Sequence, residues 1–203
     1  MFDVAEAYEV RMGRWSRQLA PLFLEFVGVR DGENVLDVGC GTADYLIALY
    51  GLFPNARCLG IDIDPNVVEL ANAQAQRAAV GGRLHLLSGD IRDAALEPPY
   101  TLILANQILH YFPPAGRPAL LQRLAALLAP GGHLALQQVV RVPERRIKSI
   151  AFFELFLRVH AGMEPLPTGD EVRTLIEGAG LTLLPPRRIA GLRVVLYFLA
   201  RKR

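Results

Sequence analysis

Along the chain, short apolar runs alternate with longer stretches in which apolar residues recur at helical spacing. The short runs predict five strands, over residues 34–38, 57–61, 84–87, 101–104 and 133–140. The longer runs predict helices between them, over residues 43–50, 64–79 and 115–128. Strands that alternate with helices imply right-handed crossovers, so this part of the chain predicts a doubly wound, parallel α/β sheet.

The two flanks depart from this alternation. An N-terminal helix is expected over residues 4–27, and we interpret residues 1–28 as a helical lid. A helical insertion is expected over residues 145–170. A capping box at Thr168 predicts the start of a further helix. Two last strands predict an antiparallel pair at the sheet edge, over residues 181–184 and 194–200. We therefore expect a mostly parallel, seven-stranded sheet in a single domain that covers residues 1–203.

Composition narrows the class of protein. Of the 203 residues, 52% are hydrophobic and 21% are charged, which indicates a globular chain. Apolar runs are shorter than the roughly 20 residues that cross a bilayer, and the first residues are acidic where a signal peptide is basic. Cys40 and Cys58 lack zinc-site spacing. We expect a reduced, cytoplasmic protein with no metal and no membrane partner.

Charge is spread unevenly along the chain. Residues 1–140 hold 10 Lys and Arg against 14 Asp and Glu, whereas residues 141–203 hold 12 against 6. A basic segment attracts acidic ligands or is simply a solvated surface. Because no nucleic-acid-binding motif accompanies it, we expect no nucleic acid partner.

Two features place a ligand at neighbouring strand ends. The first strand runs into Gly39-Cys40-Gly41, where glycines without a Cβ let the backbone and a helix N-terminus approach a ligand. About twenty residues later, Asp62 ends the second strand, where a carboxylate is placed to accept hydrogen bonds from a ribose diol. Together they predict a cofactor that contains a nucleoside.

Charge at the turn bears on which cofactor binds. A dinucleotide fingerprint has a third glycine where this chain has Asp44, and Asp37 precedes the turn. Both carboxylates would repel a pyrophosphate, whereas a cofactor with an amine and a sulfonium suits them. A nicotinamide oxidoreductase is therefore the disfavoured alternative.

Five segments in this order and spacing resemble the motifs of class I S-adenosylmethionine-dependent methyltransferases of the small-molecule type: Val35–Asp44, Gly60–Pro65, Ser88–Ile91, Leu104–His110 and Leu128–Leu134. The resemblance implies a Rossmann-like methyltransferase fold with S-adenosylmethionine as the cofactor. The chain departs from the family at Ala43, which replaces a third glycine, and at residues 99–102, which lack the usual acid.

The resemblance also implies roles for single residues. Those expected at the cofactor are Asp37 at the amine, Gly39, Cys40 and Gly41 at the methionine part, Asp62 at the ribose, Ile63, Asp90 and Ile91 at the adenine, and Asn106 and Gln107 near the methyl group. Tyr8, Arg11 and Trp15 share one face of the N-terminal helix. That face either covers the cofactor or packs on the domain as an ordinary amphipathic helix.

His110 follows the fourth strand, where several O-methyltransferases of this family place a general-base histidine. The alternative is an imidazole that only makes local hydrogen bonds. The insertion at 145–170 is expected to wall the acceptor with apolar side chains, which are equally compatible with a core. We expect methyl transfer to a small, fairly apolar acceptor at oxygen, with nitrogen and carbon open, by a monomer or homodimer. A catalytically silent cofactor-binding module that contacts a partner is the alternative.

Overall fold

The computed structural model describes residues 14–80, 84–141, 157, 162–185 and 195–203. The chain divides into two compact units between Leu104 and Ala105. Tyr8 and Arg11 of the predicted lid, and residues 145–156 and 158–161 of the predicted insertion, lie outside the described residues. Trp15 belongs to the first described helix.

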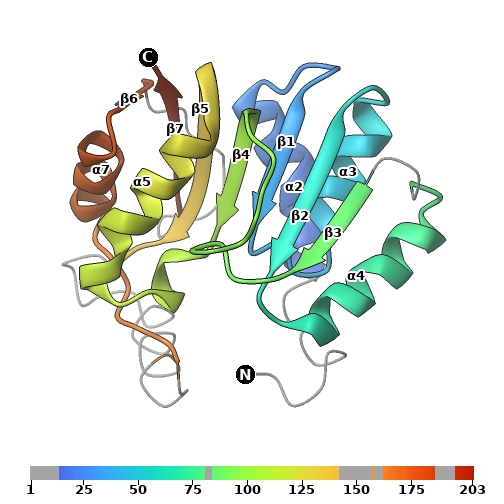
Figure 1. Ribbon diagram of the computed structural model, residues 1–203, viewed down its shortest axis with the longest axis horizontal. Coiled ribbons are helices and arrows are strands. Elements are labelled where there is room, and N and C mark those ends of the chain that lie inside the picture. Colours follow the sequence, from blue (N-terminus) through green and yellow to red (C-terminus); the bar gives the residue numbers. More distant parts are fainter. Residues whose placement is uncertain (1–13, 81–83, 142–156, 158–161, 186–194) are drawn as a thin grey trace. The chain divides into compact units, whose positions relative to one another are not determined.

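The sheet has seven strands in the order β3-β2-β1-β4-β5-β7-β6. Their bounds are Asn34–Val38 (β1), Arg57–Asp62 (β2), Leu84–Ser88 (β3), Tyr100–Asn106 (β4), Leu128–Val139 (β5), Leu181–Leu183 (β6) and Val195–Lys202 (β7) (Figure 1). β1 pairs with β2, and β2 with β3, in parallel. β7 pairs antiparallel with both β5 and β6. The predicted mostly parallel sheet with an antiparallel edge pair is confirmed.

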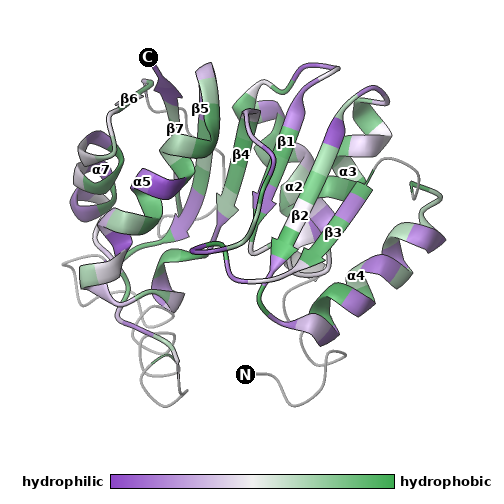
Figure 2. Ribbon diagram, viewed as in Figure 1, coloured by the Kyte–Doolittle hydropathy of each residue, from purple (hydrophilic) through white to green (hydrophobic). Residues whose placement is uncertain are grey.

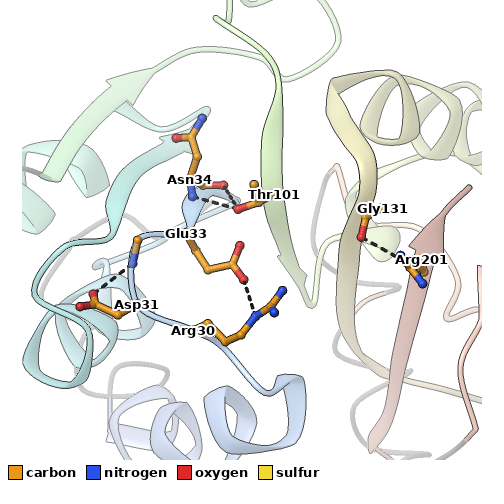
Figure 3. Close-up of polar contacts among 8 residues, drawn as sticks. Arg30, Asp31, Glu33, Asn34, Thr101, Gly131 and Arg201 are labelled. Carbon is orange, nitrogen blue, oxygen red and sulfur yellow. Dashed lines mark hydrogen bonds and ion pairs between the residues drawn. The ribbon is translucent and has the colours of Figure 1, made fainter.

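The unit before Ala105 contains three described helices, Arg14–Val27 (α2), Asp44–Leu52 (α3) and Pro65–Arg77 (α4). α2 packs against α3, and α4 packs against β2 and β3. The Asp64 carboxylate caps α4 by accepting the Asn66 N–H. Figure 2 shows apolar residues along β1 and a mixture of polar and apolar residues on α4. Asn34 N–H donates to Thr101 Oγ1 at 2.9 Å and ties the start of β1 to β4 (Figure 3).

The unit from Ala105 onward contains the 3-10 turns Leu109–Tyr111 (η2) and Pro114–Gly116 (η3), and the helices Arg117–Leu127 (α5) and Gly169–Gly178 (α7). α5 packs against β5 and α7. The predicted capping box at Thr168 is present. The Arg201 Nε–H donates to the Gly131 carbonyl at 3.4 Å, which joins β7 to the start of β5 (Figure 3).

Two details differ from the sequence-based expectation. β5 begins at Leu128, although the Pro130-Gly131-Gly132 segment predicted a start at residue 133. The backbone is already extended at Leu128, and Gly131, at φ 76°, takes a conformation that admits a bend without ending the strand. No pattern predicted η2, because a 3-10 turn of three residues has no hydrophobic period. None of the helices in the described ranges has the length and apolar content needed to span a membrane.

Candidate functional site

The turn after β1 is fastened to the end of β2. The N–H groups of Gly39 and Cys40 donate to the Ile61 carbonyl at 2.8 and 3.1 Å. The next N–H, that of Gly41, donates to Asp62 Oδ2 at 2.9 Å. Gly39 and Gly41 have φ values of 71° and 54°, in the left-handed region that side chains disfavour. The turn therefore needs its two glycines, and it brings the backbone of the first motif onto the acid of the second.

Asp62 is held in a fixed orientation. Besides the Gly41 N–H, its carboxylate accepts the N–H of Asp64 at 3.1 Å. Burial raises the pKa of Asp62 from its usual value, while these backbone hydrogen bonds act in the opposite direction. A carboxylate has about four acceptor positions, and the backbone of Gly41, Ile63 and Asp64 uses at most three of them, so an acceptor position remains for a ligand. This arrangement suits the predicted ribose contact.

Asp37, near the end of β1, is the least satisfied acid of this region. It is only 2% exposed, and its Oδ2 has no hydrogen-bond partner among the described residues. Burial, reinforced by the negative charge of Asp62, raises the pKa of Asp37 to about 8. A buried polar atom without a partner is costly, and a cationic ligand offsets that cost. The ammonium and sulfonium of S-adenosylmethionine therefore fit this pair of acids.

Cys40 has a packing role in the turn. It is a buried free thiol, and burial followed by the charges of Asp37 and Asp62 raises its pKa, so the sulfur stays protonated. A methyl group added at Gly60 would come within 2.9 Å of this sulfur and 2.7 Å of Leu86. Gly60 therefore lets the turn and the neighbouring strand β3 approach β2 closely.

Ala43 and Asp44 follow the turn, where the resemblance leads us to expect a third glycine. Ala43 has φ 62°, so it keeps the glycine-like backbone conformation, at a cost of about 1–2 kcal/mol. Asp44 begins α3 and is buried, and its carboxylate accepts from Thr42 Oγ1 at 2.7 Å. Its other oxygen lies 3.5 Å from the Arg17 guanidinium. The Asp44 side chain thus makes its described contacts with the protein at the start of α3.

The residues expected at the adenine differ in availability. Ile63, directly after β2, is 59% exposed, so its apolar surface is available to a flat ring. Ile91 is buried. Both oxygens of Asp90 accept from Arg92 Nε, at 3.0 and 2.9 Å, and hydrogen bonding by Arg92 lowers the pKa of Asp90. The predicted adenine contact of Asp90 would have to share the carboxylate with Arg92.

Two residues at the end of β4 were expected near the methyl group. The side-chain nitrogen and oxygen of Asn106 are buried and have no partner in the described part of the chain. Gln107 has φ 54°, its N–H donates to the Gln137 carbonyl at 2.7 Å, and its Oε1 accepts the Val139 N–H at 2.9 Å. Gln107 is therefore tied to β5, whereas the Asn106 amide is left for another group to satisfy.

His110 lies in η2 and is 4% exposed. Its Nδ1 is 3.4 Å from Gln138 Nε2, and burial together with the Arg117 charge lowers the pKa of His110 to about 4. Arg117 Nε donates to the Leu109 and Phe112 carbonyls at 3.0 and 3.1 Å, and another of its nitrogens donates to the Pro165 carbonyl.

Sequence reasoning missed Gln138 and Arg117. For Gln138, the signal was a pair of glutamines inside an apolar strand. For Arg117, nothing in the sequence marks a buried cation. No three acidic, histidine or cysteine side chains in the described ranges are grouped to hold a metal ion.

Comparison with known proteins supports the reading of these motifs. Residues 35–132 match the family model of the methyltransferase domain. Demethylspheroidene O-methyltransferase from Rhodobacter capsulatus is 25% identical over 179 residues, which are 88% of this chain and 44% of that protein. The tRNA1(Val) (adenine(37)-N6)-methyltransferase from Porphyromonas gingivalis is 32% identical over 164 residues, 70% of this chain and 60% of that protein.

Solved structures extend the comparison to the fold. An O-methyltransferase family protein from Burkholderia thailandensis has a TM-score of 0.84 at 21% identity, over 98% of this chain and 59% of that one. The chain spans less than half the length of the first curated relatives it matches. The match over residues 35–132 and the relatives identify this part of the chain as a methyltransferase domain of the S-adenosylmethionine-dependent kind, and the solved structure shows the same fold.

Proposed function

We propose that the chain transfers a methyl group from S-adenosylmethionine to a small, fairly apolar acceptor, at oxygen. The observation that carries the proposal is the pair of acids at the ends of β1 and β2. Asp37 is buried with an unpartnered oxygen, and backbone N–H groups orient the Asp62 carboxylate, which keeps an acceptor position for a ligand. A cofactor that combines a cation with a ribose diol satisfies both residues at once.

The chain's own residues bind and orient the cofactor. Asp62 accepts from the ribose hydroxyls, Ile63 packs on the adenine, and Asp37 pairs with the amine, beside the backbone of the turn from Gly39 to Gly41. S-adenosylmethionine supplies a methyl group that its sulfonium already activates. The protein then has to align the acceptor with that methyl group and exclude water.

The small acceptor and the choice of oxygen have separate support. The relative from Rhodobacter capsulatus is named for methylation at oxygen. In the described part of the expected acceptor-side insertion, Leu157 and Leu166 are buried, which suits an apolar wall or core. The tRNA-directed relative makes nucleic acid the rival acceptor class.

The test has two stages. Calorimetric titration with S-adenosylmethionine should give saturable binding, whereas NADH should give none. Incubation of the protein with methyl-labelled S-adenosylmethionine and a metabolite extract should then place label in a small molecule, and a parallel incubation with bulk tRNA should leave the RNA unlabelled. Label in the tRNA alone would replace the acceptor class. Binding without transfer to either pool would favour the silent module, and binding of NADH alone would overturn the proposal.

A further inference from the structure

Ser88, the last residue of β3, lies next to Asp62 in the sheet. β2 and β3 are parallel neighbours, and the Cα atoms of Asp62 and Ser88 are partners in their register (Figure 1). The pairing continues past them, because the Gly89 N–H donates to the Asp62 carbonyl at 2.9 Å. Neighbouring strands lie roughly 4.8 Å apart. The sheet therefore holds Ser88 one strand away from the acid that we expect at the ribose.

The side chains of Asp62 and Ser88 lie on the same face of the sheet. Gly60 and Leu86, two residues earlier on each strand, are also partners in the register. A Cβ added at Gly60 would lie 2.7 Å from the Leu86 side chain, so the positions of this pair share a face. Side chains alternate between the two faces along a strand. Two residues later the side chains therefore return to that face, which places Ser88 beside Asp62.

Asp62 has fewer acceptor positions left than a ribose diol has donors. Of the roughly four positions of a carboxylate, the N–H groups of Gly41 and Asp64 use two, at 2.9 and 3.1 Å. The backbone of Ile63 is a further donor to Asp62. This leaves about one position, whereas a ribose diol brings two O–H groups. The second hydroxyl needs an acceptor of its own close to Asp62.

Ser88 has the chemistry and the accessibility for this contact. A serine hydroxyl has two acceptor lone pairs besides its single donor, so it accepts a hydrogen bond whatever it donates to. Ser88 is exposed, and Asp62 is half-buried. Ile63, directly after β2, is 59% exposed. A ligand therefore reaches the ends of β2 and β3 from solvent.

Building on the proposed binding of S-adenosylmethionine, we infer that Ser88 is a further cofactor-binding residue. Its hydroxyl accepts a hydrogen bond from one hydroxyl of the ribose, and Asp62 accepts from the other. This division refines the ribose contact of Asp62, and it makes the site selective for a ribose over a deoxyribose. Both residues belong to the unit before Ala105.

Calorimetry of S-adenosylmethionine with Ser88→Ala tests the contact without any methyl acceptor. The variant should bind roughly three- to tenfold more weakly, the usual effect of losing one neutral hydrogen bond. Ser88→Thr keeps the hydroxyl and should retain the wild-type affinity. His85→Ala is the matched control and should also bind as wild type does, because His85 is an exposed residue of β3 on the opposite face. Urea midpoints of Ser88→Ala and wild type should agree, since Ser88 is exposed.

The 2′-deoxy and 3′-deoxy forms of S-adenosylmethionine identify the group that Ser88 contacts. Wild type should bind both more weakly than the parent cofactor. One of the two should bind equally to Ser88→Ala and wild type, because the hydroxyl that faces residue 88 is already missing from it.

Two results would overturn the inference: wild-type affinity of Ser88→Ala for the parent cofactor, or the same loss of affinity with both deoxy forms. Either of them, obtained while wild type binds S-adenosylmethionine, would leave the proposed function in place. Wild type that binds no S-adenosylmethionine would overturn the proposed function, and the role of Ser88 with it.

Discussion

Asp37 at the end of β1 and the polar cluster around His110 are both buried, whereas Asp62 at the end of β2 is half-buried, and the hydrogen bonding of the two regions differs. In the first region, Asp37 leaves a carboxyl oxygen without a partner among the described residues, next to a second acid. In the second region, Arg117 and Gln138 satisfy backbone carbonyl and N–H groups of their own unit. The Asp37 carboxyl keeps an oxygen that a cation can satisfy, whereas the described contacts of Arg117 and Gln138 are made to the protein's own backbone.

This difference separates polar groups that a ligand can satisfy from polar groups that stabilise the folded chain. A buried unpaired acid lowers stability, and a protein retains one where a ligand recovers the energy. A buried arginine that joins three carbonyls stabilises the loops to which they belong. Mutations in the two regions should therefore have opposite effects on the stability of the ligand-free protein.

The largest effect is expected for Asp37→Asn. Asp37 has a pKa of about 8 in the folded protein, whereas an aspartate in the unfolded chain has about 3.8. The folded state thus retains a proton that the unfolded state has lost, so wild type loses stability as pH rises from about 4 to about 8. The substituted amide cannot ionise, and the variant should exceed wild type at pH 9 by on the order of 3 kcal/mol.

The same substitution should weaken S-adenosylmethionine binding, because the amine loses its anionic partner. Urea unfolding at pH 5 and pH 9, with calorimetry of the cofactor, measures both effects. Asp31→Asn provides a control, since Asp31 is an exposed acid of the same unit that accepts from Asn55. A variant that is no more stable than wild type at pH 9, or that binds the cofactor with the wild-type affinity, would show that Asp37 is not a group that the ligand satisfies.

Arg117→Met should have the next largest effect and the opposite sign. The carbonyls of Leu109, Phe112 and Pro165 lose a charged donor, and the free energy of unfolding should fall by about 2–3 kcal/mol. Arg30→Met is the matched control, because Arg30 is largely exposed and its contact with Glu33 spans 3.8 Å. Equal urea midpoints for the two variants would show that the cluster around His110 is not what holds these turns.

The fold was predictable because it depends on regular patterns. Asp64 with Pro65 marked the start of α4, and Thr168 with Glu171 marked that of α7. The antiparallel pair of β6 and β7 followed from short apolar runs separated by prolines and a glycine. These signals are local, so the sequence carries them directly.

The state of the site residues was less predictable, because it depends on partners far away in the sequence. Nothing near Asp37 indicates that one oxygen lacks a partner among the described residues, and nothing near His110 indicates that Gln138, 28 residues later, lies 3.4 Å from its ring nitrogen. The pairing of Asp90 with Arg92 is local, but its geometry becomes visible only in the structure. Sequence motifs located the acids and the imidazole, and packing decided their protonation.

Asp62→Ala is expected to weaken S-adenosylmethionine binding by about 1–3 kcal/mol, through the loss of charge-assisted hydrogen bonds to the ribose. It also frees the Gly41 and Asp64 N–H groups, so the turn after β1 should lose order. Asp64→Ser is the control, because serine keeps the N-cap of α4. Calorimetry measures the affinities, and an unchanged affinity for the alanine variant would refute the ribose contact.

The smallest effect is expected for Asp90. Its carboxylate is neither buried without a partner among the described residues, as that of Asp37 is, nor part of the cluster around His110. Arg92 already binds both of its oxygens, yet Arg92 is largely exposed, so water and salt weaken the pair. If Asp90 accepts a hydrogen bond from the adenine amine, Arg92→Gln should make the Asp90 carboxylate available to that amine. The affinity for S-adenosylmethionine should then rise by less than about threefold. Asp90→Asn should lower that affinity, and added salt should change it less in Arg92→Gln than in wild type. Should neither variant change the calorimetric affinity, Asp90 acts only on its own loop, and the adenine contact rests on Ile63 and Ile91.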